Sequence, residues 1–130
     1  MTDTKGTPSN LSDDIHLVYF YDANGNIGQL VKAVESTLPI ILARYEYYPF
    51  GGILVSTGTY AEINPFKFST KYRDSETGLY NFGYRYLIPR LGRWTNHDPL
   101  EEFGGVNLYL ALMNDPINWF DPFGLLPDPC

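Results

Sequence analysis

The sequence predicts a mainly β protein, in which antiparallel β-hairpins form a curved sheet and one short α-helix lies near the carboxyl terminus. Aromatic residues make up 16% of the 130 residues, with 11 Tyr and 8 Phe. The 12 Gly and 10 Pro are spread along the whole chain. Strand-forming residues that alternate with frequent turn residues favour many short strands over long helices. A chain of this length has room for one hydrophobic core.

Residues 1–14 are expected to form a disordered or extended lead, because they are polar and acidic and have no apolar periodicity. They also lack the basic residues and apolar core of a signal peptide. No stretch of the chain approaches the roughly 20 apolar residues of a membrane span. We therefore expect no membrane insertion, and we expect synthesis in the cytoplasm with any export by a route other than the general secretory one. The localisation itself stays open.

Residues 15–63 contain two copies of one hairpin unit. The first joins IHLVYFY to IGQLVKAV across DANGN, whose Asn24-Gly25 pair suits the positive φ angles of a tight turn. The second joins PIILARYEYY to ILVST across PFGG. A Tyr-x-Tyr pair precedes each turn and places both rings on one face of its strand. We expect these rings to pack in the core or against the neighbouring unit.

A third hairpin is predicted from FKFSTKYRD and LYNFGYRYLIP, followed by a short last strand at WTNH. The stretch 79–89 is predicted to be the strongest strand of the chain. Its alternating Tyr80, Phe82, Tyr84 and Tyr86 should lie on a single face of the sheet.

The periodicity then changes to that of a helix. Asp98-Pro99-Leu100-Glu101 has an acidic N-cap, a proline at the first helical position and a glutamate at the third. Apolar residues recur at i, i+3, i+4 and i+7 from Val106 to Met113, which predicts a short amphipathic helix over residues 106–114. Asp115-Pro116 should end it, and INWFDPFGL should run on as an extended segment.

Residues 64–125 resemble the RHS repeat-associated core domain motif by motif. The matching pieces are Asn64-Pro65-Phe66, SETGLY, GYRY, GRW, DPLEEFGGVNLY, NDPIN and DPFGL, in that order. The two upstream hairpins look like degenerate YD repeats, since Tyr21-Asp22 keeps the pair whereas Tyr48 stands where aspartate is usual. The resemblance divides the chain into the lead (1–14), two YD-type hairpin units (15–63), the core (64–125) and a short tail (126–130).

The residues that carry these motifs are expected to have structural roles. They are Tyr21, Asp22, Gly25, Gly78, Tyr80, Tyr84, Arg85, Tyr86, Gly92, Arg93, Asp98, Pro99, Gly104, Gly105, Asn107, Tyr109, Asn114, Pro116, Asp121, Pro122 and Gly124.

The resemblance implies a place in a larger assembly. RHS proteins are bacterial polypeptides related to the cocoon-forming subunits of Tc toxins and to teneurins. Their YD strands spiral into a hollow shell that the core domain closes, and the chain usually continues past Asp-Pro-x-Gly-Leu into a toxin. In several members the core domain cuts the chain after that leucine, here Leu125, with aspartates as an aspartyl-protease-like site.

The cutting chemistry needs two carboxylates that share a proton. The first aspartate of the family maps onto Asp98, whose usual arginine neighbour is His97 in this sequence. The second acidic position maps to Leu110–Met113, which contains no carboxylate. Asp115 and Asp121 could substitute, but each precedes a proline and can serve in a turn. We therefore expect Asp98 to be a cap and the chain to stay uncut after Leu125.

No metal, cofactor or nucleic acid is expected. Two isolated histidines, His16 and His97, and a single terminal Cys130 do not give the ligand spacing of a metal site. The formal net charge is −6, and the basic residues are scattered singly, which disfavours contact with a nucleic-acid backbone.

The leading hypothesis is a non-enzymatic structural and interaction module, an orphan RHS core domain that associates through strand edges. The stem from Ile15 to Ala33 carries little charge and no proline, so it is the expected edge. The partner would be another copy of the chain or a separately encoded RHS shell. The alternatives are an aspartyl-type autoprotease that cuts after Leu125 and a carbohydrate-binding module that uses the Tyr-rich face. An intact mass would identify a cut chain, and a glycan array would identify sugar binding.

Overall fold

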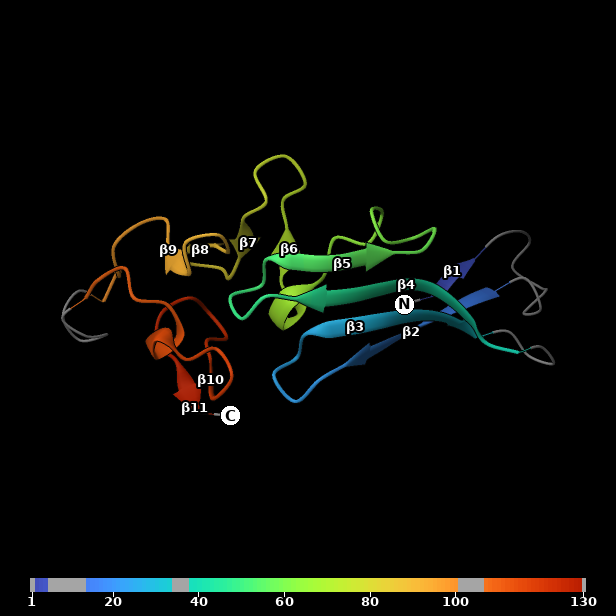
Figure 1. The fold of residues 1–130 in the computed structure, drawn as a ribbon, viewed down its shortest axis with the longest axis horizontal. Coiled ribbons are helices and arrows are strands. Elements are labelled where there is room, and N and C mark those ends of the chain that lie inside the picture. The colour runs from blue at the N-terminus through green and yellow to red at the C-terminus, as the bar shows by residue number, and fades with distance from the viewer. Residues whose placement is uncertain (1, 5–13, 34–37, 101–106, 130) are drawn as a thin grey trace.

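The computed structural model describes residues 2–4, 14–33, 38–100 and 107–129, which form three antiparallel sheets (Figure 1). The largest sheet has five strands in the order β1-β2-β3-β4-β5. The second has four strands in the order β6-β7-β8-β9, and β10 pairs with β11. In Figure 1 the five-stranded sheet occupies one side of the view, and the shorter strands and the carboxyl-terminal segment lie beside it. The predicted mainly β fold is confirmed.

The five-stranded sheet contains the two hairpins that the sequence predicts. Its strands are β1 (Thr2–Thr4), β2 (Asp14–Tyr21), β3 (Ile27–Ala33), β4 (Ile40–Tyr47) and β5 (Ile53–Thr57). Part of the expected lead is therefore extended, since β1 pairs with the start of β2 in the register Thr2↔His16. Residues 5–13 of that lead lie outside the described residues.

Each pair of neighbouring long strands contains one register shift. The shifts fall between Phe20 and Tyr21, between Leu30 and Val31, and between Glu46 and Tyr47. Bulges of this kind bend a strand and increase its right-handed twist. They account for the curvature that β3 and β4 show in Figure 1.

The four-stranded sheet is made of much shorter strands than the sequence predicts. They are β6 (Tyr72–Arg73), β7 (Tyr80–Asn81), β8 (Tyr86–Ile88) and β9 (Arg93–Trp94). The expected strand at FKFSTKYRD is instead a 3-10 turn, η2 (Phe68–Thr70), followed by the two residues of β6. The expected last strand at WTNH is confined to β9.

The prediction of one strand over residues 79–89 is wrong. The chain folds back at Gly83, whose φ is +112°, so that β7 pairs with β8 in the register Tyr80↔Leu87. A residue without a Cβ adopts this φ easily, and the turn interrupts the alternation of side chains. Tyr80 is fully buried, whereas Tyr84 is 65% exposed. The predicted single aromatic face is therefore absent.

The predicted α-helix over residues 106–114 is reduced to a three-residue 3-10 turn, η4 (Leu112–Asn114). Leu110 instead forms a β-bridge with Arg93. Ala111 and Leu112 are buried in the core, so the apolar spacing reflects packing of a turn rather than one face of a helix. Residues 101–106, which include Gly104 and Gly105, lie outside the described residues.

Two hydrophobic clusters share one tyrosine. The first cluster is formed by the short strands and the turns beside them, and it consists of Phe68, Tyr80, Phe82, Leu87, Trp94, Ala111 and Leu112. The second lies under the five-stranded sheet and consists of Ile27, Leu30, Ala43, Tyr45 and Ala61. Tyr47 packs against both, and its hydroxyl donates a hydrogen bond to the Ile27 carbonyl at 2.7 Å. Burial raises the pKa of Tyr47, so this hydroxyl remains a donor.

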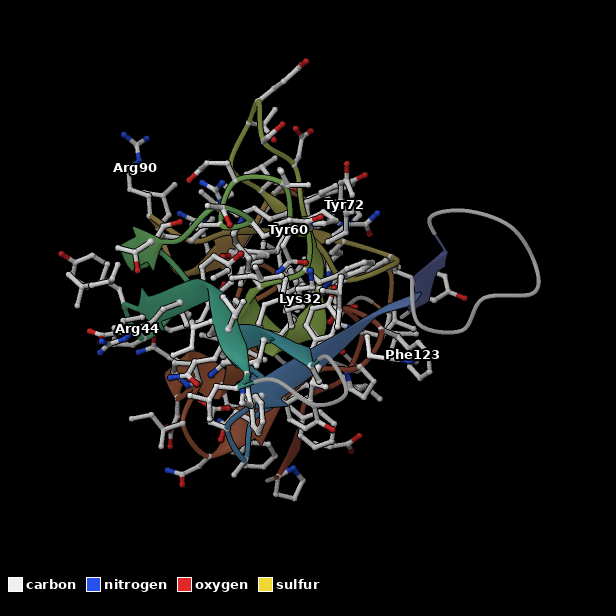
Figure 2. All side chains as sticks on the ribbon, turned by 90° about the vertical axis from the view of Figure 1, so that its right-hand side faces the viewer. Lys32, Arg44, Tyr60, Tyr72, Arg90 and Phe123 are labelled. Carbon is white, nitrogen blue, oxygen red and sulfur yellow. The ribbon has the colours of Figure 1, made fainter. Side chains whose placement is uncertain are left out.

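The surface carries scattered apolar and basic side chains. Figure 2 shows Phe123 projecting on one side of the molecule and Arg44 and Arg90 on the other. Within the described part of the chain, no helix has the length and apolar character needed to cross a bilayer.

The left-handed backbone at η4 leads to a stability prediction. Met113 is half exposed and has a φ of +52°, a conformation that costs a residue with a Cβ about 1–2 kcal/mol. We expect Met113→Gly to be more stable than Met113→Ala by about 1 kcal/mol in urea unfolding, because only glycine avoids this cost. At an ordinary helical position the order is reversed. An alanine variant as stable as the glycine variant would contradict the assigned backbone conformation.

Candidate functional site

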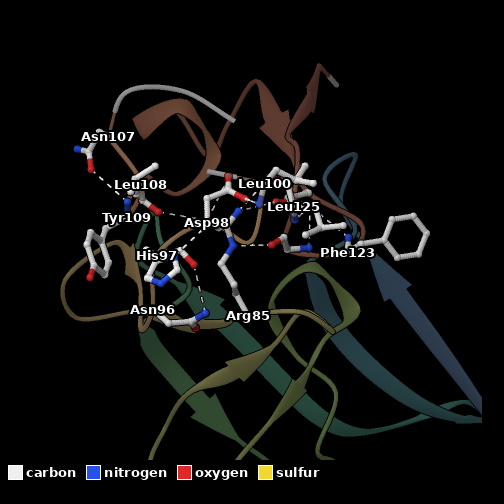
Figure 3. A network of polar contacts seen from close by, with 12 residues as sticks. Arg85, Asn96, His97, Asp98, Leu100, Asn107, Leu108, Tyr109, Phe123 and Leu125 are labelled. Atoms are coloured by element: carbon white, nitrogen blue, oxygen red, sulfur yellow. Dashed lines mark hydrogen bonds and ion pairs between the residues drawn. The ribbon is translucent and has the colours of Figure 1, made fainter. Parts of the chain in front are cut away.

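A buried arginine lies at the junction of the short strands and the carboxyl-terminal segment (Figure 3). Arg85 follows the turn at Gly83, and its side chain is only 2% exposed. Its Nη1 atom lies 3.5 Å from Oδ2 of Asp98, and its Nη2 atom lies 3.8 Å from Oδ2 of Asp121. Both carboxylates are buried as well. The structure therefore brings together two of the three predicted candidate aspartates, with one cation between them.

The same guanidinium binds three backbone carbonyl groups. Arg85 Nε donates to the Gly124 carbonyl, Nη2 donates to the Leu125 carbonyl at 3.1 Å, and Nη1 donates to the Leu108 carbonyl at 3.4 Å. The guanidinium also lies 4.4 Å from the centroid of the Trp94 ring. One side chain thus connects β9, the segment after Asn107 and the Asp-Pro-Phe-Gly-Leu segment.

The remaining carboxylate oxygens are occupied by backbone N–H groups. Oδ1 of Asp98 accepts from the N–H of Leu100 at 2.8 Å, so the side chain binds the backbone of the turn that follows it. Oδ1 of Asp121 accepts from the N–H groups of Phe123, Gly124 and Leu125 at 3.1, 2.7 and 3.1 Å. Asp121 therefore shapes the turn in which Gly124 has a φ of +71°.

Two opposing effects act on the pKa of Arg85, namely its burial and the two neighbouring carboxylates. Burial lowers the pKa of the Arg85 guanidinium, and Asp98 and Asp121 act in the opposite direction. Arginine nevertheless remains charged in proteins. An aspartyl-protease pair needs two carboxylates that face each other and share a proton. In this structure a guanidinium separates them, which is the arrangement of a structural ion-pair network.

The third candidate, Asp115, has a different role. Its carboxylate accepts from the backbone N–H and the Nδ2 atom of Asn118, and these hydrogen bonds lower the pKa of Asp115. It therefore stabilises its own turn before Trp119.

The first YD motif is tied to the carboxyl-terminal half of the chain. Oδ1 of Asp22 accepts from the N–H groups of Asn24 and Asn26 at 2.9 and 3.0 Å, so Asp22 shapes the β2–β3 turn. The Asn24 Nδ2 atom then donates to the carbonyls of Pro116 and Ile117 at 2.8 and 2.7 Å. The predicted turn between β2 and β3 therefore also contacts a segment that is distant in the sequence.

Other motif residues lie in turns or on the surface of the short strands. Gly25, Gly78 and Gly92 have positive φ angles of +79°, +75° and +63°. The guanidinium of Arg93 lies 5.2 Å from the centroid of the Tyr109 ring.

Sequence reasoning missed the central position of Arg85, the buried Lys67 and the partly buried Lys71. Arg85 was expected only as a motif residue. Lys67 donates from Nζ to the Asn64 carbonyl at 2.9 Å, and burial lowers its pKa. Lys71 donates to the Pro122 carbonyl, and burial lowers its pKa as well. The feature of the sequence that could have indicated these cations is a single basic residue placed between aromatic residues. No group of three or more His, Cys, Asp and Glu residues that could hold a metal ion occurs in the described ranges.

Comparison with known proteins gives relatives that cover nearly the whole chain. No family model matches it. The toxin subunit YenC1 of Yersinia entomophaga is 38% identical over 125 residues, which is 94% of this chain and 12% of YenC1. The toxin protein Tse5 of Pseudomonas aeruginosa is 44% identical over 62 residues, which is 48% of this chain and 5% of Tse5. The crystal structure of TcdB2-TccC3 matches 92% of this chain and 6% of the other chain, with a TM-score of 0.76 and 33% identity.

The chain carries an RHS-repeat-related domain. The resemblance that the motifs predict is thereby confirmed. This RHS-repeat-related domain spans about a tenth or less of the length of the two curated relatives.

The ion-pair network of the RHS-repeat-related domain leads to a stability prediction. Arg85→Met leaves two buried carboxylates without their cation, and we expect a loss of about 3–5 kcal/mol in the free energy of unfolding. The matched control is Arg93→Met, because that guanidinium lies over the Tyr109 ring at the surface, and it should cost about 1 kcal/mol or less.

If Arg85→Met does not fold, the triple variant that adds Asp98→Asn and Asp121→Asn distinguishes the cause. It removes both unpaired charges, so it should recover part of the lost stability in urea unfolding. Equal losses for Arg85→Met and Arg93→Met would contradict the structural role of the network.

Proposed function

We propose that the chain is a non-enzymatic structural module that extends or closes an RHS-type shell through the edge of its five-stranded sheet. Its relatives are Tc toxin and RHS-type toxin proteins, which supports a structural, shell-associated role. The buried ion pairs support the same role, because Asp98 and Asp121 each accept hydrogen bonds from the backbone of a turn and both lie beside Arg85.

The outer edge of β2 is the observation that carries the proposal. β3 pairs with β2 on its inner side, whereas on the outer side β1 pairs only with Asp14–His16, and no strand of the described chain lies beside Leu17–Tyr21 there. Unpaired edges recruit further strands unless charge, proline or a covering segment blocks them. The edge is apolar and aromatic, with Val18, Phe20 and Tyr21 all exposed. Leu17–Tyr21 itself contains no charged residue and no proline that would oppose an added strand.

Two partners fit this edge. A second copy of the chain could present the same β2 edge, which gives a closed dimer, or its β5 edge, which gives a head-to-tail contact that propagates into an open assembly. A separately encoded RHS shell would supply a strand that continues the sheet. Both use main-chain hydrogen bonds along β2 and differ only in the source of the added strand.

The size of the purified protein tests self-association through this edge. We expect light scattering after size exclusion to give a species larger than the monomer, and Phe20→Lys to shift it toward the monomer, because edge lysines oppose strand addition. Tyr84→Lys is the matched control, since it also replaces an exposed ring but lies between β7 and β8.

A monomeric wild-type protein at high concentration would exclude the self-assembly form of the proposal. The shell form is tested with YenC1 from which the region matching this chain has been removed. Co-elution that Phe20→Lys abolishes would support the shell form, and no co-elution would contradict it.

Self-cleavage after Leu125 is the second candidate function. The Leu125 carbonyl accepts a hydrogen bond from Arg85 at 3.1 Å, and the buried Asp98 and Asp121 lie on the same guanidinium. A polarised carbonyl beside two carboxylates is the observation that favours this chemistry.

The intact mass of the purified chain separates the two functions. Under the structural proposal we expect a single species that retains residues 126–130. A species that ends at Leu125, and that disappears in Asp98→Asn, would instead establish self-cleavage.

Sugar binding stays a prediction. The exposed rings of Tyr21, Tyr48, Tyr72 and Tyr84 come from different strands and turns, so they offer separate stacking positions. A glycan array without a binder would contradict this function.

A further inference from the structure

A groove of 790 Å³ lies at the opposite edge of the five-stranded sheet from β2. It is bounded by the start of β5, by the β6–β7 hairpin and by the turn between β8 and β9. Its lining includes Tyr48, Ile53, Arg73, Leu79, Arg90 and Leu91. The floor is thus largely apolar, and two arginines border it.

Neither arginine forms an ion pair within the described part of the chain. No ion pair involves Arg73 or Arg90 there, and no Asp or Glu lines the groove. Asp74 is adjacent to Arg73 in the sequence, and its Oδ1 atom accepts from the N–H groups of Glu76 and Thr77. These hydrogen bonds and the charge of Arg73 lower the pKa of Asp74, which does not line the groove. Figure 2 shows the Arg90 side chain projecting outward from the ribbon. In a chain of net charge −6, this groove is a local region of positive charge.

The adjoining strand offers unused backbone groups. β5 is the last strand of its sheet, so its outer edge has no neighbouring strand among the described residues. Ile53, its first residue, lines the groove, and Leu54 and Leu91 are both exposed. An extended segment paired with β5 would continue directly into the groove. Alternate side chains of that segment would face the apolar floor and the arginines.

We propose that this groove binds an extended acidic segment of a partner protein, which adds to the edge of β5 and places carboxylates against Arg73 and Arg90. Apolar side chains two residues before and after a carboxylate would contact Tyr48, Leu79 and Leu91. The planar guanidinium groups suit carboxylates, because each can donate two parallel hydrogen bonds. The proposal is independent of the β2 edge, since the two edges lie at opposite sides of the sheet.

A displayed library of random ten-residue peptides, selected on the full chain, tests the proposal. We expect the enriched peptides to carry Asp or Glu with apolar residues at i−2 and i+2. A synthetic copy of the most enriched peptide should bind the double variant Arg73→Gln and Arg90→Gln about tenfold or more weakly, with a shallower salt dependence.

The matched control is the double variant Lys32→Gln and Arg44→Gln, which removes two positive charges that do not line the groove. It should bind the peptide as the wild-type chain does, and near-ultraviolet circular dichroism checks the fold of both variants. The proposal is overturned if no peptide is enriched, if the enriched peptides lack acidic residues, or if both double variants bind equally. A change of oligomeric state in the groove variant alone would assign the groove to a second copy, and this too would overturn the proposal.

Discussion

The burial of one guanidinium between two carboxylates is the constraint on which the carboxyl-terminal half depends. A buried charge is costly unless it is paired and its donors are hydrogen-bonded. Arg85 meets this condition with Asp98, Asp121 and three carbonyls from two separate segments. These segments contain few regular strands, so few backbone ladders hold them together. The ion pairs and the Trp94 ring below the guanidinium do so instead.

The two long edges of the five-stranded sheet differ in chemistry. The β2 edge is apolar and aromatic, whereas the region beside β5 carries Arg73 and Arg90. A module between two unlike neighbours needs such a difference, because identical edges would allow it to insert in either direction. YenC1 and the TccC3-containing chain match 94% and 92% of this chain but are far longer polypeptides, in which most of the length lies outside the matched region. The contacts that the β2 edge and the groove beside β5 can make are therefore the features that bear most directly on the role of the chain.

The sequence predicts the first half of the fold well and the second half poorly, for a physical reason. In residues 15–57 the alternation of side chains and the Asn24-Gly25 turn act locally, so strands β2 to β5 follow from them. Beyond residue 79 distant contacts decide the conformation. Gly83 turns the chain back inside an apparently ideal strand, and Leu110 bridges to Arg93 where helical spacing predicts a helix. The candidate site shows the same difference between local and distant contacts. The contact of Asp98 with the Leu100 N–H joins near neighbours in the sequence, so a local pattern can predict it. The position of Arg85 depends on partners 13 to 40 residues away and leaves no local pattern.

Tyr47 belongs to both hydrophobic clusters, and its hydroxyl is bonded to the backbone of β3. Because its ring contacts Phe68 as well as Tyr45, neither cluster can lose its packing without exposing part of the other. We therefore expect the hairpin units and the segment that follows them to unfold as one cooperative unit. Destabilisation of either sheet would then spread to the other through the Tyr47 ring, and the two hairpin units would not separate from the short strands before global unfolding.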